Sequence, residues 1–420
     1  MIYKHVVEDA KRCLQCHSPL CSTGCPVATS IREVISLFLA SDIQEAGRIL
    51  FENNPLSLVC SYVCHQENQC EGHCIQGRKG MPVHISAIER YISDFYLSTY
   101  QPRRSTKERG KVAVIGGGPS GITIAFILAS RNFGVTLYEG NDSLGGMLRY
   151  GIPEFRLPKS IIDRLAEKLL DSGVYIRPNT TIGSNLSVDD LFRDGFDAVF
   201  LGTGVWKPRQ LHVVGESLGN VHYAIEYLRN PDAYRLGNSV SVIGAGNVAM
   251  DVARTAVRHG SRQVTVYARS DASSITAYDS SLEYAKIDGV TIELFKAVVE
   301  ITEQGAIFID TEVVTDAEGK KKTVPIAGTE SLEPSDSIIL AIGQGPRSVI
   351  VSSTKGIDLK ASGLVDVDEW GHTTRAGVFA GGDVVTGAKT VVEAVRISKQ
   401  VADAIDAYVT ALKQNNSSDA

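Results

Sequence analysis

The residues best suited to chemistry in this 420-residue chain are its cysteines, and all of them lie in the first 74 positions. They form two runs, C-x2-C-x4-C-x3-C-P and C-x3-C-x5-C-x3-C, made of Cys13, Cys16, Cys21, Cys25, Cys60, Cys64, Cys70 and Cys74. Thiolates bind both zinc and iron–sulfur clusters, and nearby histidines (His17, His65, His73) keep zinc open as an alternative. The Cys-Pro ending resembles ferredoxin-type runs, in which the last cysteine serves another cluster.

A glycine-rich pattern occurs twice, about 128 residues apart, as "VAVIGGGPSGITIAFILASRNFGVTLYEG" and "VSVIGAGNVAMDVARTAVRHGSRQVTVYARS". The small residues that recur are Gly116, Gly118 and Gly121, then Gly244, Gly246 and Ala249. The first allows a tight turn, the second lets the backbone approach a pyrophosphate, and the third lets helix and strand pack closely. Each copy therefore predicts a strand, a turn, a helix and a strand that bind a dinucleotide.

The two copies differ at the end of their second strand. The first ends in Glu139, which can accept hydrogen bonds from a ribose 2′-hydroxyl, so this site suits FAD or NAD. The second has Ala268 and then Arg269, which removes repulsion against a 2′-phosphate and adds a guanidinium to pair with it. The second site therefore leans toward NADPH, with a solvated arginine at a strand end as the alternative.

A third motif, "GVFAGGDVVTGAKTVVEAV", lies near the C-terminus. Gly382 and Asp383 would end a strand, and a helix beginning near Thr390 would follow, an arrangement that could bind the ribityl chain and ring edge of a flavin. If this motif completes the first site, the FAD domain is split and the second nucleotide domain is inserted in it. The ends of two further β-runs, at Gly204 and Gly343, resemble crossovers between such domains.

Around these motifs the chain predicts an α/β fold with two Rossmann-like domains, preceded by an all-α iron–sulfur domain. Apolar periodicity predicts helices in "SIREVISLFLASDIQEAGRILFEN" and "VHISAIERYISDFYLSTY", with Ser30 and Ser41 as caps. Short β-rich runs alternate with helical patterns from residue 111 onward, which predicts parallel sheets. The expected parts are a helical domain at 1–100, a linker at 101–110, an FAD domain at 111–208 and 344–420, and an NAD(P)H domain at 209–343.

Composition excludes several classes of partner. The chain has 43% hydrophobic and 21% charged residues and a net charge of −6, which suits a soluble protein that binds neither nucleic acid nor membranes. The start, "MIYKHVVEDAKRC", lacks the build of a signal peptide, so we expect a cytoplasmic protein.

A flavin beside a nicotinamide site needs an exit for its electrons. A disulfide exit would need a cysteine pair near the flavin, and no cysteine follows Cys74. Zinc cannot change its redox state. The pattern therefore favours one-electron exit through iron–sulfur clusters.

Five motifs together resemble a known family. They are "RCLQCHSPLCSTGCP", "NNPLSLVCSYVCHQENQCEGHC", "GGMLRYGIPEFRLPK", "VIGAGNVAMDVART" and "GVFAGGDVVTGAKTVVEAV". The chain resembles glutamate synthase small subunits and the N-terminal half of dihydropyrimidine dehydrogenase, and it looks most similar to the flavoprotein subunits of bacterial NAD-dependent dihydropyrimidine dehydrogenases. Glutamate synthase small subunits usually run longer and carry paired arginines after the second Rossmann strand, where this chain has "YARSD".

The resemblance implies FAD, NAD(P)H and two 4Fe–4S clusters. One cluster would take Cys13, Cys16, Cys21 and Cys74, and the other Cys25, Cys64, Cys70 and an oxygen ligand at Glu89. Cys60 is then unligated, whereas the count of thiols alone would use all eight, so Glu89 and Cys60 are alternatives. The resemblance also implies FAD contacts at Arg156 and along Glu139 to Met147. Within that segment the expected FAD contacts include Gly146 and Met147. The remaining expected cofactor-binding residues are Pro119, Ser120, Ile182, Asn247, Val248 and Val391.

We expect NAD(P)H to reduce the flavin by hydride transfer and the clusters to carry single electrons onward. No side chain is assigned as a catalytic acid, base or nucleophile. The expected partner is a catalytic subunit, either an FMN and iron–sulfur pyrimidine-reducing subunit or a glutamate synthase large subunit. The alternatives are a stand-alone NAD(P)H:ferredoxin-type reductase and a non-enzymatic redox sensor with a zinc-stabilised module.

Overall fold

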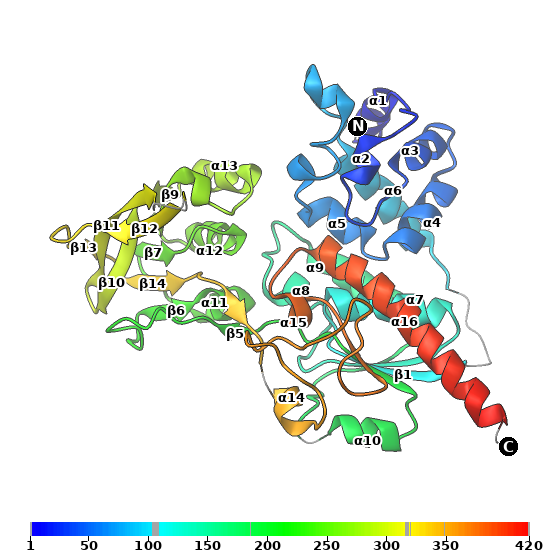
Figure 1. Ribbon diagram of the computed structural model, residues 1–420. Helices are drawn as coiled ribbons and strands as arrows, with labels where there is room; N and C mark the ends of the chain where they lie inside the picture. Colours follow the sequence, from blue (N-terminus) through cyan, green and yellow to red (C-terminus); the bar gives the residue numbers. More distant parts are fainter. Residues whose placement is uncertain are drawn as a thin grey trace. The chain divides into compact units, whose positions relative to one another are not determined.

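The computed structural model describes residues 2–102, 109–184, 186–315, 319, 321–347 and 349–418 (Figure 1). The chain forms two compact units. The first contains Met1–Leu148, Glu154–Val205 and Pro346–Ala420, and the second contains Arg149–Pro153 and Trp206–Gly345. Of the predicted linker at 101–110, residues 103–108 lie outside the described residues.

The first 100 residues form a helical module. Its helices are α1 (Ile2–Lys11), α2 (Leu20–Thr23), α3 (Ile31–Leu39), α4 (Ile43–Asn53), α5 (Ser57–Val63) and α6 (Ile85–Thr99), with 3-10 turns at Gln66–Asn68 and Ile75–Arg78. Apolar residues three and four positions apart give each long helix one buried face, which carries Ile35, Leu50, Ile88 and Ile92. Both predicted helical segments are confirmed, the first as α3 and α4.

One predicted helix cap is wrong. Helix α4 begins after Asp42, whose carboxylate accepts a hydrogen bond from the Glu45 N–H at 3.1 Å. Ser41 stands one residue earlier with a φ of +67°, outside the extended conformation that a capping residue needs. Ser30 does occupy the N-cap position of α3, but its side chain makes no capping hydrogen bond.

The first unit also contains a five-stranded parallel sheet in the order β16-β4-β1-β2-β3. Its strands are β1 (Lys111–Ile115), β2 (Gly134–Tyr138), β3 (Tyr175–Arg177), β4 (Ala198–Leu201) and β16 (Val378–Ala380). Strand β16 pairs with β4, so segments from both sides of residues 206–345 build one sheet. The accompanying helices are α7 (Pro119–Ser130), α9 (Lys159–Asp171), α10 (Val188–Arg193) and α16 (Val391–Ser418).

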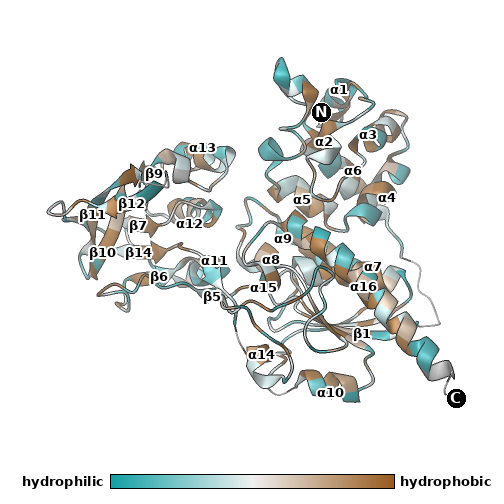
Figure 2. Cartoon of the chain, viewed as in Figure 1, coloured by the Kyte–Doolittle hydropathy of each residue, from teal (hydrophilic) through white to brown (hydrophobic). Residues whose placement is uncertain are grey.

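Helix α16 lies along α7 and links the C-terminal part of the chain to the first glycine motif (Figure 1). Hydrophobic and hydrophilic residues alternate along α16 (Figure 2), and the apolar positions Val395, Ala402, Ile405 and Val409 are buried. This one-sided pattern is what packs the helix against the unit.

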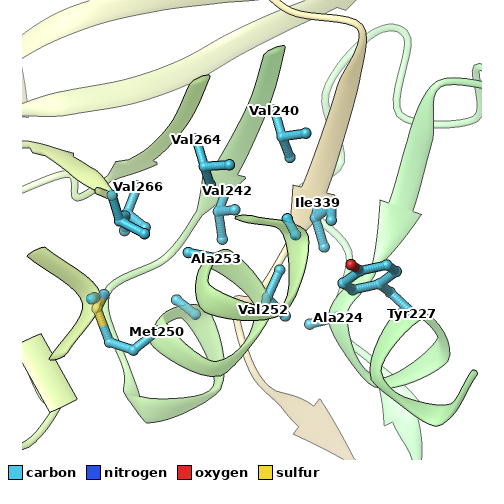
Figure 3. Close-up of a cluster of buried hydrophobic side chains, with 14 of the residues drawn as sticks. Ala224, Tyr227, Val240, Val242, Met250, Val252, Ala253, Val264, Val266 and Ile339 are labelled. Atoms are coloured by element: carbon cyan, nitrogen blue, oxygen red, sulfur yellow. The ribbon is translucent and has the colours of Figure 1, made fainter. Parts of the chain in front are cut away.

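The second unit contains another five-stranded parallel sheet, in the order β6-β14-β7-β8-β9. Its elements are β6 (Val221–Tyr223), β7 (Ser239–Ile243), β8 (Gln263–Tyr267), β9 (Thr291–Glu293) and β14 (Ser337–Leu340), with helices α11 (Ala224–Arg229), α12 (Asn247–Arg258) and α13 (Asp279–Ile287). Side chains of β7 and β8 meet those of α12 in a buried apolar cluster that includes Val242, Val266, Met250 and Ala253 (Figure 3). The predicted parallel strands are confirmed in both units.

An antiparallel sheet in the second unit was not expected from the sequence. It is built from β10 (Lys296–Thr302), β11 (Gly305–Thr315), β12 (Lys321–Pro325) and β13 (Ser331–Pro334), with β11 pairing with each of the others. The shorter elements are α8 (Met147–Tyr150), α14 (Val349–Ser353), α15 (Asp383–Thr386), the 3-10 turns Pro231–Ala233 and Ala272–Ser274, and the paired strands β5 (Lys207–Pro208) and β15 (Gln344–Gly345). None of the helices in the described ranges combines the length and apolar character that crossing a membrane requires.

Candidate functional site

The first glycine turn lies between β1 and α7. Gly116 has a φ of +101°, and its N–H donates to the Tyr138 carbonyl at 2.8 Å. A Cβ on Gly121 would stand 1.8 Å from the Gly116 carbonyl oxygen, so only glycine permits this close approach of helix and turn. Gly118 is the N-cap of α7 and Pro119 follows it, which leaves the N-terminal N–H groups of the helix facing the turn.

Glu139 stands at the end of β2, beside this turn. Its side chain is buried, with Oε2 accepting from the Gly117 N–H at 2.8 Å and Oε1 accepting from the Asn141 N–H at 2.8 Å. Backbone donors thus fix the carboxylate at the mouth of the turn, where the sequence predicted a ribose contact.

The segment after Glu139 folds back over the same turn. The Gly145 N–H donates to the Gly117 carbonyl at 2.8 Å. Gly146 has a φ of +51°, and a Cβ there would lie 2.8 Å from the Gly118 Cα. Met147 comes next and begins α8, and Arg156 is half-buried further along the chain.

The C-terminal motif also lies against the first turn. Gly382 has a φ of +74°, and a Cβ on it would be 2.1 Å from the Ser120 Oγ of α7. Asp383 follows, its carboxylate accepting from the Lys389 N–H at 3.2 Å, and burial raises its pKa to about 6. Thr390 precedes Val391, the first residue of α16, and its Oγ1 accepts from the Glu393 N–H at 3.3 Å.

Two further residues predicted for this site are Gly204, which lies near the first glycine turn, and Ile182, which lies in the apolar core. Gly204 has a φ of +67° and lies two residues after Gly202, whose carbonyl oxygen would be 2.6 Å from a Cβ on Gly116. Ile182 is only 1% exposed and belongs to the core beneath the sheet. Only the backbone of Ile182 could therefore contact a ligand.

The second glycine turn repeats the geometry of the first. The Gly244 N–H donates to the Tyr267 carbonyl at 3.0 Å, and a Cβ on Gly244 would be 2.5 Å from the Ala341 carbonyl oxygen, two residues before Gly343. Gly246 is the N-cap of α12, and Ala249 is fully buried.

The residues that follow Gly246 shape the mouth of this second turn. The Asn247 side chain accepts a hydrogen bond from the Tyr278 N–H at 3.0 Å, which fixes the loop before α13 beside the turn. Val248 is 40% exposed at the start of α12. Ala268 is buried after β8, and the Arg269 side chain is exposed next to it, while the Arg269 carbonyl accepts from the Thr311 Oγ1 at 2.7 Å.

Four thiols of the helical module come together in one group, around a hollow lined by Cys13, Cys16, Cys21 and Cys74. Burial raises the pKa of Cys13, and the Cys16 and Cys74 thiols raise it further. Burial and Cys74 likewise raise the pKa of Cys21. Bringing four thiolates together is therefore unfavourable without a cation, and bound iron would remove that cost.

A second group contains Cys25, Cys64, Cys70 and Glu89. Burial raises the pKa of Cys70 above its usual range, and Glu89 and Cys25 are among the groups that raise it further. Burial also raises the pKa of Glu89 to about 8, with a smaller contribution from Glu71. The half-buried Glu89 carboxylate makes no hydrogen bond within the described part of the chain, and its charge acts on the Cys64 and Cys70 thiols.

Cys60 lies on the other side of Cys64. Its thiol is buried and hydrogen-bonded to Cys64, and this bond is the largest reason that the pKa of Cys64 is raised. The Asn54 Nδ2 donates to the Cys60 sulfur at 3.3 Å. Which of Glu89 and Cys60 completes the second group stays a prediction.

Both groups fit four-iron clusters, which take one ligand per iron around an inorganic core. Within the described ranges, no set of three or more His, Cys, Asp or Glu side chains is arranged to hold a single metal ion. The glycine turns and Glu139 fit dinucleotides, because each turn ends at a helix N-terminus whose N–H groups can bind a pyrophosphate.

Comparison with protein-family models decides the family. Residues 103–398 match the model described as pyridine nucleotide-disulphide oxidoreductase, and residues 1–100 match dihydropyrimidine dehydrogenase domain II, 4Fe-4S cluster. The chain belongs to the pyridine nucleotide-disulphide oxidoreductase family. As a member of it, this protein is an NAD(P)-dependent flavoprotein oxidoreductase that uses FAD, NAD(P)H and 4Fe–4S clusters.

Curated relatives of this oxidoreductase support the resemblance found in the sequence. It is 33% identical to the glutamate synthase [NADPH] small chain of Azospirillum brasilense, over 96% of this chain and 89% of that protein. It is also 33% identical to the NAD-dependent dihydropyrimidine dehydrogenase subunit PreT of Salmonella typhimurium, over 96% and 94%. A third relative, the putative oxidoreductase AegA of Escherichia coli, is 33% identical over 94% of this chain, which spans only 64% of AegA.

Solved structures share the fold of the two nucleotide-binding parts. FprA from Mycobacterium tuberculosis in complex with NADPH has a TM-score of 0.61 at 16% identity, over 73% of this chain and 86% of FprA. Thioredoxin reductase of T. acidophilum has a TM-score of 0.54 at 19% identity, over 72% of this chain and 98% of that chain. No cysteine lies in residues 103–398, so the disulphide in the family's name has no counterpart there.

Proposed function

We propose that this oxidoreductase is an electron-input subunit of the dihydropyrimidine dehydrogenase type, which passes electrons from NAD(P)H to a catalytic partner. The observation that carries the proposal is that the cysteine-rich helical module packs on α7, α9 and α16, helices of the compact unit that also contains the predicted FAD site. An electron exit through this module accounts for the cysteines and for the lack of a disulfide near the flavin.

The predicted FAD site consists of the first glycine turn, Glu139, the segment at Gly146 and the motif at Gly382. The second turn, at Gly244, would hold the nicotinamide dinucleotide. When bound, the flavin accepts electron pairs and the clusters carry single electrons, and this chemistry belongs to the cofactors.

The chain's own residues bind and position the cofactors. Helix N–H groups of α7 and α12 would bind pyrophosphates, and the fixed Glu139 carboxylate would accept a ribose hydroxyl. The thiolates and Glu89 would hold the clusters apart from water, and an oxygen ligand would shift the potential of the cluster that it binds.

The proposed division into a helical domain at 1–100, an FAD domain at 111–208 and 344–420, and an NAD(P)H domain at 209–343 follows from these assignments. The proposed donor is NAD(P)H: the exposed Arg269 leans toward NADPH, and the absence of a second arginine in "YARSD" weakens that lean. A cytoplasmic location suits thiolate ligands, which need a reducing compartment.

The proposed partner is an FMN and iron–sulfur subunit that reduces a pyrimidine. Similarity to PreT over nearly the full length of both proteins supports it. A glutamate synthase large subunit is the second candidate, because glutamate synthase small chains are equally similar. The single arginine in "YARSD" favours the first candidate.

Reconstitution tests the proposal. The purified chain is mixed with a pyrimidine-reducing subunit or with a glutamate synthase large subunit, and substrate-dependent oxidation of NADH and NADPH is followed. Oxidation that depends on uracil supports the proposal, whereas oxidation that depends only on the glutamate synthase substrates overturns it. Activity with ferredoxin that neither subunit increases would instead show a stand-alone reductase.

A cysteine variant separates input from exit in the same assay. Cys21→Ser removes one thiolate of the first group, so partner-dependent turnover should fall while NAD(P)H oxidation by ferricyanide, which needs no cluster, is retained. Equal loss of both activities would contradict the assignment of the module as the exit.

A further inference from the structure

Contacts of several kinds join the helical module to the rest of the first unit. Phe51 packs edge-on against Phe126 of α7 with ring centroids 5.2 Å apart. Arg164 of α9 pairs with Asp94 of α6 at 2.6 Å. Another contact joins the Lys399 Nζ of α16 to the Asn53 Oδ1 of α4 at 2.5 Å, and hydrogen bonds continue from it to a predicted cluster ligand.

From Lys399 a chain of hydrogen bonds leads to the Cys25 sulfur. The Asn53 Nδ2 donates to the Thr29 Oγ1 at 3.4 Å and to the Val27 carbonyl at 3.1 Å. Thr29 is 5% exposed, and its hydroxyl lies 3.3 Å from the Cys25 sulfur. The side chains of Lys399, Asn53, Thr29 and Cys25 thus form one line of hydrogen bonds into the module. Lys399 and Asn53 are 346 residues apart in the sequence.

With Cys25 as a thiolate ligand of the cluster, the direction of each bond in this line follows from which groups can donate. Lys399 can only donate, so the Asn53 atom facing it must be the amide oxygen. The amide nitrogen then faces Val27 and Thr29, which leaves the Thr29 hydroxyl proton for the sulfur. A thiolate can only accept, so every donor in the line points from the ammonium toward Cys25.

Two groups near Lys399 favour its charged form. Burial lowers the pKa of Lys399, whereas the neighbouring Asp403 and Cys25 favour its charged form. Asp403 is also paired with Arg131, the residue after α7, at 2.6 Å, so its negative charge is shared. Reduction of a cluster adds one negative charge, and a half-buried cation nearby stabilises the reduced state more than the oxidised one.

We propose that Lys399 is a positioning residue that raises the reduction potential of the second cluster, acting on the Cys25 sulfur through Asn53 and Thr29. This role rests on the proposed assignment of Cys25 to that cluster. It makes that cluster a better electron acceptor. No atom is transferred, and the only redox change is the one-electron reduction of the cluster.

The test is an anaerobic titration of the full chain with dithionite, in which the midpoint of each cluster is followed by electron paramagnetic resonance. Lys399→Met removes the charge at nearly constant volume, and Lys399→Arg keeps it. We expect the methionine variant to lower one midpoint by about 59 mV, which corresponds to a tenfold less favourable one-electron reduction, while the other midpoint stays in place. Lys399→Arg should retain the native value, and Thr29→Val should lower the same midpoint.

Lys413 provides a matched control on the same helix. It pairs with Asp197 at 2.6 Å and lies 14 residues beyond Lys399, a distance of about 21 Å along α16. Lys413→Met should move neither midpoint. The proposal is overturned if Lys399→Met leaves both midpoints unchanged, or if Lys399→Arg shifts them as much as Lys399→Met does.

Measuring the iron and sulfide content of each variant distinguishes a failure of this proposal from a failure of the cluster assignment on which it rests. If Lys399→Met loses iron, the midpoint potentials are measured instead on Lys399→Gln, which keeps a hydrogen-bond donor to Asn53 but carries no charge. Loss of iron in both neutral variants would show that Lys399 holds the module in place and would overturn a role in setting the potential. A native chain that contains no iron would instead refute the cluster assignment.

Discussion

Gly382 tests whether the C-terminal motif completes the first nucleotide site. With a φ of +74° and a ψ of −153°, Gly382 has a backbone conformation that is essentially confined to glycine, so an alanine there is strained by about 1–3 kcal/mol. Its Cβ would also stand 2.1 Å from the Ser120 Oγ, which adds about 1–3 kcal/mol of overpacking. Gly382→Ala should therefore destabilise the first unit by about 2–6 kcal/mol.

The two parts of this cost can be separated because they have different sources. Ser120→Ala removes the Oγ and leaves the Ser120 Cβ 3.2 Å from the new Cβ, so the double variant should keep the strain and lose most of the clash. The assay is the temperature at which FAD fluorescence is released. We expect Gly382→Ala to lower it by roughly 5–10 °C and the double variant to recover about half of that loss.

Two results would refute this reasoning. If Gly382→Ala released FAD at the native temperature, Gly382 would not be held against α7. If the Ser120→Ala background recovered none of the loss, the clash would lie elsewhere, and the two motifs would not meet as described.

Three further predictions concern single residues. Arg269→Ala should raise the KM for NADPH about tenfold or more and leave that for NADH unchanged, because one charge-assisted contact to a 2′-phosphate is lost; equal effects on both would contradict this. Cys60→Ala should keep about eight irons per chain whereas Glu89→Ala should keep about four, and the reverse pattern would make Cys60 the ligand. Asp288→Asn should lower the unfolding midpoint of the second unit at pH 7. Burial raises the pKa of Asp288, but hydrogen bonds from Arg254 and Arg258 outweigh it and hold this pKa below its usual 3.8. The Asp288 carboxylate therefore stabilises the folded protein above pH 3.8, and this stabilisation is lost in acid, where the native and variant proteins should have the same unfolding midpoint.

Much of the fold could be predicted because local sequence dictates it. Runs such as "KVAVI" and "SVSVI" are buried strands, and the glycines after them permit turns that no other residue allows. The grouping of Cys13, Cys16, Cys21 and Cys74 was implied by resemblance to a family, and in the structure these four thiols line one hollow.

Other features depend on interactions that local patterns do not carry. Ser41 and Asp42 are both good capping residues, and only the backbone conformation at Ser41 decides between them. The antiparallel sheet from β10 to β13 has a turn signal in "TEQG", but its strands mix charged and apolar residues. The contact between Lys399 and Asn53 joins residues 346 positions apart, so no periodicity could indicate it.

The central claim is that electrons leave this protein through inorganic clusters in its first 100 residues. Quantitation of iron, acid-labile sulfide and FAD in the full chain, purified without oxygen, tests it most directly. The account predicts about eight irons and eight sulfides for each FAD. A chain that retains FAD but holds fewer than about four irons would contradict it.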